Sequence, residues 1–128
     1  MSFVDILRNK TDFIGSNGRT KEEILQAEEE LCVRFADEYH EYLEKIGLAS
    51  AEGHELTGLT KDSRLNVVTV TKEYRAMYGS DTVSWYVVED VGIDGLVIWQ
   101  DEKGTIYQTS FTVAPVKIAE SLEEYLKD

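Results

Sequence analysis

Residues 20–47 hold two helix patterns separated by a short apolar break, and this arrangement limits how the rest of the chain can fold. A Thr-Lys-Glu-Glu capping box at 20–23 predicts the start of the first helix. Val-Arg-Phe at 33–35 interrupts it, and the second helix ends before Gly47. The predicted apolar faces are Ile24, Ala27 and Leu31, then Tyr39, Tyr42, Leu43 and Ile46. Two short helices with one apolar face each must pack on something larger.

The second half of the chain supplies that larger element. Residues 84–90, 95–100 and 105–110 are rich in Val, Ile, Tyr and Trp, which predicts three strands. Gly-Ile-Asp-Gly at 92–95 and Asp-Glu-Lys-Gly at 101–104 are typical of hairpin turns between them. An earlier strand is possible in 54–59. The sequence therefore predicts a mostly antiparallel sheet.

Residues 66–79 are ambiguous between strand and helix. The β-branched start favours a strand, but Asn66 is a good N-cap and Gly79 a good helix stop. Val67, Val70, Tyr74 and Met77 also recur at helical spacing, so we predict a helix.

Two further capping boxes, at 2–5 and 121–124, predict a short first helix over 3–9 and a closing helix. The fold class is then α+β: N-terminal helices on a mostly antiparallel sheet, with a middle helix and a closing C-terminal helix. We expect one domain over residues 1–128, without an internal repeat or linker.

The charge and the cysteine content restrict the partners. A net charge of −12, spread along the whole chain, repels nucleic acid and anionic membranes and attracts a basic protein, although acidity for solubility alone is an alternative. The lone Cys32 cannot form an internal disulfide, and its helix position predicts a buried core residue. With no signal peptide or membrane span, we expect a cytoplasmic protein.

Catalytic and metal motifs fail on spacing. His40 and Glu41 begin an H-E-x-x-H pattern that Glu44 breaks, and the second histidine, His54, is far along the chain. The Gly15–Thr20 loop lacks the phosphate-binding pattern. We therefore predict no catalytic residues, no metal site and no cofactor. A hydrolase using an acidic pair such as Glu89 and Asp90 is disfavoured, because neighbours on a strand point to opposite faces.

Carboxylates and large aromatic side chains gather between residues 81 and 103. Exposed aromatic residues beside carboxylates are typical of protein-binding hot spots. Alternation along a strand places Trp85 and Tyr86 on opposite faces, so one of them should point away from the core. The predicted partner-binding residues are Glu89, Asp90, Asp94, Asp101, Glu102, Trp85 and Trp99.

The order of these motifs resembles the SUKH superfamily of Smi/Knr type over about residues 20–128. The family opens with I-x-x-A-E-x-x-L, an apolar break ending in Phe-Pro, an aromatic-x-x-aromatic-Leu helix and a glycine. The matching residues are Ile24, Ala27, Glu28, Leu31, Phe35, Tyr39, Tyr42, Leu43 and Gly47. Further matches are 53–59, Asn66 to Arg75, 86–95, Gly104 with Tyr107, and 121–126. Ala36 departs from the family's proline, which affects stability more than function.

The resemblance implies a binding role. Bacterial members look like immunity proteins that bind and neutralise a cognate toxin domain, often a nuclease, in the cytoplasm. For this chain it implies a toxin partner, and the net charge of −12 predicts that the toxin is basic and that neither nucleic acid nor a membrane is bound. The alternative is an adaptor that binds a cellular regulator, since fungal relatives act in cell-wall regulation. The resemblance implies no shared set of contact residues.

Overall fold

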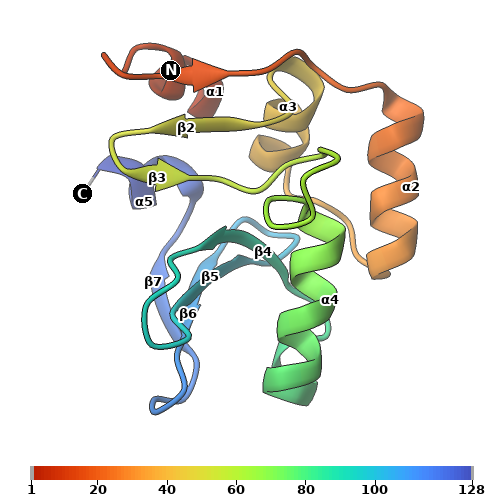
Figure 1. Cartoon of the computed structure of the whole chain (residues 1–128), viewed down its shortest axis with the longest axis vertical. Helices are drawn as coiled ribbons and strands as arrows, with labels where there is room; N and C mark the ends of the chain where they lie inside the picture. Colours follow the sequence, from red (N-terminus) through yellow and green to blue (C-terminus); the bar gives the residue numbers. More distant parts are fainter. Residues whose placement is uncertain (1, 128) are drawn as a thin grey trace.

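The structure is a computed structural model that describes residues 2–127, and it confirms the α+β class. In that range five α-helices pack on two antiparallel sheets, with strand orders β1-β2-β3 and β4-β5-β6-β7 (Figure 1). The helices are α1 (Phe3–Arg8), α2 (Lys21–Leu31), α3 (Asp37–Lys45), α4 (Val67–Tyr78) and α5 (Leu122–Lys127), with a 3₁₀ turn η1 (Gly79–Thr82). The strands are β1 (Ile14–Gly15), β2 (Ala49–Ala51), β3 (His54–Glu55), β4 (Tyr86–Asp90), β5 (Val97–Gln100), β6 (Ile106–Thr109) and β7 (Val116–Ala119).

The helix–break–helix region forms as predicted, with one correction. Thr20 and Glu23 make both bonds of the capping box, and the predicted apolar faces of α2 and α3 are buried. Cys32, predicted to lie in the core, is exposed. It ends α2 in a left-handed conformation (φ 54°), which turns the chain, and the core is filled here by the buried Phe35 and the partly buried Val33 instead.

A buried hydrogen-bond network connects the start of α3 to the four-stranded sheet. The Ala36 amide donates to the Tyr86 hydroxyl (2.9 Å), which donates to Gln100 Oε1 (2.6 Å). Gln100 Nε2 donates to Glu38 Oε1 (2.7 Å), which also accepts from the Leu122 amide at the start of α5. The four residues of this network thus satisfy one another's buried polar groups, as burial requires.

Two further tyrosines of α3 bind the segment between β3 and α4. Tyr42 donates to the Thr57 carbonyl (2.8 Å) and accepts from the Ala49 amide of β2 (3.0 Å). Tyr39 shares a 2.8 Å hydrogen bond with the Thr57 hydroxyl. Since Thr57 in turn donates to the Val87 carbonyl of β4, α3 holds both sheets together.

The ambiguous segment 66–79 is a helix, as predicted, and it covers one face of the four-stranded sheet (Figure 1). Asn66 caps it by accepting from the Val68 and Thr69 amides. Val67 and Val70 are buried, but Met77, predicted on the same face, is 60 % exposed. In the last turn Tyr78, not Met77, faces the sheet: its ring packs edge-on against Trp99 with centroids 6.4 Å apart.

The strands in the structure differ from the predicted ones mainly in length. The predicted strands at 84–90, 95–100 and 105–110 are shorter at their ends. The early segment 54–59 forms a strand over 54–55 and isolated bridges at Leu56 and Gly58. The three very short or late strands β1, β2 and β7 were not predicted. At the closing helix Ser121 accepts from the Glu124 amide, but the Glu124 carboxylate binds the Glu120 amide, so only half of that capping box forms as predicted.

The network around Tyr86 gives a stability prediction. Tyr86→Phe should lower the free energy of unfolding by about 1–3 kcal/mol, because it leaves the buried Ala36 amide and Gln100 carbonyl oxygen without a partner. Urea unfolding measures the change. Tyr107→Phe is the control, because that half-buried hydroxyl makes a single bond to Asp101, and its loss should be smaller. Equal losses in the two variants would contradict the network.

Glu38 gives a second prediction, on pH dependence. Burial raises the pKa of this carboxyl above its ordinary value of 4.5, although the amide of Leu122 and the side chain of Gln100 partly oppose the shift. Because the folded pKa exceeds the unfolded one, the contribution of Glu38 to stability is present below pH 4.5 and lost as pH rises through the folded pKa.

Glu38→Gln keeps an acceptor but cannot ionise. Its stability relative to the unmodified protein should therefore increase as pH rises from about 4.5 toward neutrality. Urea unfolding across that range measures the difference, with Glu73→Gln on the exposed face of α4 as the control. A difference that does not change with pH would show that Glu38 is not the titrating group.

Candidate protein-binding surface

The antiparallel pairing of β4 and β5 divides the predicted contact residues between two ends of the sheet. Tyr86 pairs with Gln100 and Asp90 pairs with Val97. Trp85, Asp101 and Glu102 therefore lie at one end, here called the Trp85 end. Asp90 and Asp94 lie at the other, here called the loop end, so the predicted set is not one cluster.

Two predicted contact residues are corrected, because their side chains are not at the surface. Trp99 is fully buried between β5 and α4, where its indole nitrogen donates to the Thr109 hydroxyl (2.8 Å). Glu89 is 5 % exposed. Other elements cover both faces of the sheet at β4 and β5. Side chains that alternate between the two faces are therefore buried on either one.

Glu89 instead joins three elements from inside. Its Oε1 accepts from the Tyr125 hydroxyl of α5 (2.6 Å) and lies 2.9 Å from Nδ1 of His54 on β3. Burial, then the adjacent carboxylate, raises the pKa of Tyr125 above its ordinary value. This buried cluster connects β3, β4 and α5 and gives the predicted Glu89 a role within the fold.

At the Trp85 end, an aromatic stack lies beside carboxylates. The Trp85 and Tyr107 rings stack with centroids 4.0 Å apart and planes within 8°. Arg75 of α4 donates to the Trp85 carbonyl (2.9 Å) and to the Leu31 carbonyl (2.8 Å), which fixes this end against α2. The half-buried stack lines a shallow depression together with Asp81, Pro115 and Lys117.

The two predicted carboxylates at the Trp85 end have different roles. Asp101 accepts from the Lys103 and Thr105 amides (2.9 and 3.0 Å) and from the Tyr107 hydroxyl (3.1 Å), so its charge stabilises the β5–β6 turn. Glu102 is exposed at the tip of that turn. Of these two residues, Glu102 is the one that offers a free carboxylate.

At the loop end, the structure adds apolar residues that sequence reasoning missed. Met77, Ile93, Phe111 and Val113 are each at least 60 % exposed. They come from the end of α4, at the lower right of Figure 1, and from the β4–β5 and β6–β7 turns, at its lower left. The Tyr78 hydroxyl, which donates to the Gly95 carbonyl, joins the helix end to the β4–β5 turn. The available signal was the presence of Ile, Phe and Val inside turn segments, where polar residues are the norm.

The two predicted aspartates at the loop end shape it. Asp90 accepts from the Gly92 amide (3.0 Å) and the Tyr74 hydroxyl (2.9 Å). Burial, then the bond to Asp90, raises the pKa of Tyr74 to about 12. Asp94 is exposed, in a left-handed turn conformation (φ 52°). Asp94 is therefore the freer of the two charges.

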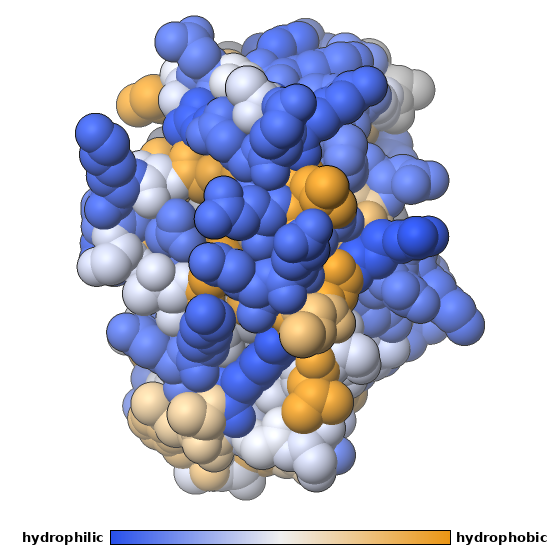
Figure 2. Space-filling model, turned by 90° about the vertical axis from the view of Figure 1, so that its right-hand side faces the viewer, coloured by the Kyte–Doolittle hydropathy of each residue, from blue (hydrophilic) through white to orange (hydrophobic). Residues whose placement is uncertain are grey.

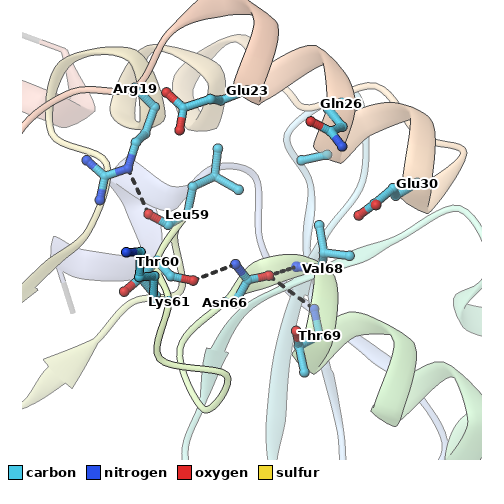
Figure 3. Close-up of a pocket in the computed structure, with 11 residues that line it drawn as sticks. Arg19, Glu23, Gln26, Glu30, Leu59, Thr60, Lys61, Asn66, Val68 and Thr69 are labelled. Atoms are coloured by element: carbon cyan, nitrogen blue, oxygen red, sulfur yellow. Dashed lines mark hydrogen bonds between the residues drawn. The ribbon is translucent and has the colours of Figure 1, made fainter.

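A groove of about 680 Å³ separates α2 from the start of α4 (Figure 3). Glu23, Gln26 and Glu30 of α2 face Lys61 and Asn66 across it. Much of its polar lining already binds the protein itself. Arg19 donates to the Leu59 carbonyl (2.8 Å), and the side-chain amide of Asn66 donates to the Thr60 carbonyl and accepts from the Val68 and Thr69 amides. With charges of both signs, the groove favours no one class of ligand.

The face formed by α2 and α4 is largely hydrophilic (Figure 2). Hydrophobic side chains form a broken column on it and gather again at its lower end. Over residues 2–127, no helix is long and apolar enough to cross a membrane. No group of three or more His, Cys, Asp or Glu side chains in that range is placed to hold a metal ion.

Comparison with known proteins gives one family. The family model described as "SUKH_5: SMI1-KNR4 cell-wall" matches residues 2–128. A search of curated proteins found no match. The match includes the first helix, which lies outside the region of the resemblance described above.

The placement of the two tryptophans gives a prediction for fluorescence. Trp85→Phe leaves Trp99, which is fully buried, so its emission should resist acrylamide quenching. Trp99→Phe leaves the half-buried Trp85, so quenching should be stronger. Far-UV circular dichroism checks that each variant is folded. The reverse order of quenching would contradict this arrangement of the sheet.

Proposed function

Because this chain belongs to the SMI1-KNR4 family of the SUKH superfamily, we propose that it is an immunity protein that binds a cognate toxin domain and neutralises it by protein–protein contact. We further propose that it acts in the cytoplasm as one domain, without a cofactor and without chemistry of its own. Membership over nearly the whole chain is the observation that carries this proposal.

The charge of the molecule supports a basic partner, such as a nuclease domain. With a net charge of −12, the chain attracts cationic proteins at long range and increases the rate at which they meet it. The same charge disfavours direct binding to nucleic acid, whose phosphates it repels. A nuclease surface that attracts phosphates is itself basic, so an acidic protein can occupy the place of the substrate.

The use of the buried and half-buried carboxylates supports a binding role over catalysis. Glu89 accepts from Tyr125, Asp90 from Tyr74, and Asp101 from Tyr107. Each carboxylate is held by a hydroxyl of the same chain, whereas an acid–base pair must reach a common substrate atom. The carboxylates that remain free, such as Glu102 and Asp94, are suited to contact with a partner.

A second candidate function is an adaptor that binds a cellular regulator. The matching family model carries the words "cell-wall", which favours regulation in relatives of this chain. The two functions share a protein-binding surface and differ in the partner. A partner encoded away from this gene would favour the adaptor.

The test is growth rescue. The toxin-like protein encoded next to this gene is expressed alone and then with this chain. We expect rescue together with a stable one-to-one complex, and an association rate that falls steeply between low and physiological salt. A salt-independent rate would remove the electrostatic part of the proposal. No rescue and no complex would contradict the toxin partner, and a pull-down would then test the adaptor.

A further inference from the structure

Four strongly exposed apolar side chains lie at the loop end, on the last turn of α4 and on the two neighbouring hairpin turns. Phe111 is 66 % exposed, Ile93 64 %, Val113 61 % and Met77 60 %. A scattered exposed apolar residue is ordinary, but several on neighbouring turns mark an interaction site. These four side chains form the loop-end patch.

The turns that carry the patch are tied together before any partner arrives. Tyr78 of α4 donates to the Gly95 carbonyl (2.7 Å), and the Phe111 amide donates to the Asp94 carbonyl (3.3 Å). The Phe111 ring covers Gly95 so closely that a Cβ there would lie 2.5 Å from it. A surface held in this way loses little conformational entropy on binding.

The charge around the patch has one sign. Residues 90–96 and 110–115 contain Asp90 and Asp94 and no lysine or arginine. The nearby Lys117 of β7 is paired with Glu120. A partner that covers the patch therefore meets apolar side chains with carboxylates at their margin.

This combination selects among possible partners. In a symmetric dimer the same patch would face itself, so the exposed Asp94 would approach its own copy within an assembly of doubled negative charge. An anionic lipid surface would likewise be repelled. Only a basic partner gains from both the apolar centre and the acidic margin.

We propose that the loop end is the docking surface of this chain, and that its partner is a basic protein presenting large apolar side chains among lysines and arginines. This inference rests on the proposed function only in requiring a protein partner. The Trp85 end is the less suitable surface, because its aromatic rings are half-buried and stacked on each other. Its free Glu102 contributes long-range attraction.

The test uses a defined probe in place of the partner. The whole ¹⁵N-labelled chain is titrated with an amphipathic peptide of leucine and lysine, and separately with its leucine–glutamate counterpart. We expect the lysine peptide to shift the amide signals of residues 91–96 and 110–113, and the glutamate peptide to leave them unchanged.

Two matched double variants separate the patch from charge and from exposure in general. Ile93→Lys with Val113→Lys should weaken binding of the lysine peptide about tenfold or more. Ile14→Lys with Leu25→Lys adds the same charge at side chains that are 70 % and 54 % exposed but lie on β1 and α2, and it should bind almost as the unmodified protein does. Urea unfolding confirms that both variants are folded.

Several results would overturn the proposal. These are shifts centred on the Trp85 end or on the groove between α2 and α4, equal responses to both peptides, and equal weakening in both double variants. A further contradicting result is a dimer that forms with increasing concentration in analytical sedimentation, together with concentration-dependent shifts of the same amide signals. It would show that a second copy of the chain occupies the surface.

The probe contains no toxin, so this test and the growth rescue fail independently. A failed rescue contradicts the toxin as the partner but does not affect the proposed docking surface. A negative titration contradicts the docking surface but does not affect the proposed toxin partner. Where rescue succeeds, Ile93→Lys with Val113→Lys should abolish it and the matched control should not.

Discussion

The buried hydrogen-bond network from Ala36 to Leu122 is the constraint on which the rest of the structure depends. It runs from the Ala36 amide through Tyr86, Gln100 and Glu38 to the start of α5. The groups that it joins lie far apart in sequence, so the network forms only when the helix–break–helix region, the sheet and the last helix are all in place. Its polar groups are costly to bury unpaired, which disfavours any packing that separates them.

This constraint explains how the acidic residues divide into two kinds. Glu38, Glu89 and Asp90 accept hydrogen bonds from distant segments, and Asp101 accepts from the amides of its own turn. Their charge is held close to donors and contributes less to the outer field. Glu102 and Asp94 are exposed and act on a partner at long range. A count of carboxylates in the sequence does not distinguish the two kinds.

What could be predicted from the sequence follows the range of the interactions. The capping boxes at Ser2 and Thr20, and the cap at Asn66, involve residues two or three apart, and all three form. Cys32, Met77 and Trp99 were misplaced because their burial depends on what lies across from them. Strands β1 and β2 were missed because strands of two or three residues show too little alternation.

In the candidate surface, too, the local features could be predicted from the sequence and the long-range ones could not. Asp94 and Glu102 were found because turns are local and their charges stay in solvent. The loop-end patch joins Met77, Ile93 and Phe111 from three separated segments, and only the pairing of the strands brings these together.

Ala36 shows how this chain adapts the family pattern to its own core. Its backbone (φ −59°, ψ 152°) would suit a proline, and α3 has no side-chain cap at its start. A proline would restrict the unfolded chain but would remove the amide that binds the Tyr86 hydroxyl. The two effects oppose each other and have similar size, about 1 kcal/mol each. Alanine is therefore tolerated here because Tyr86 uses the hydrogen that proline lacks.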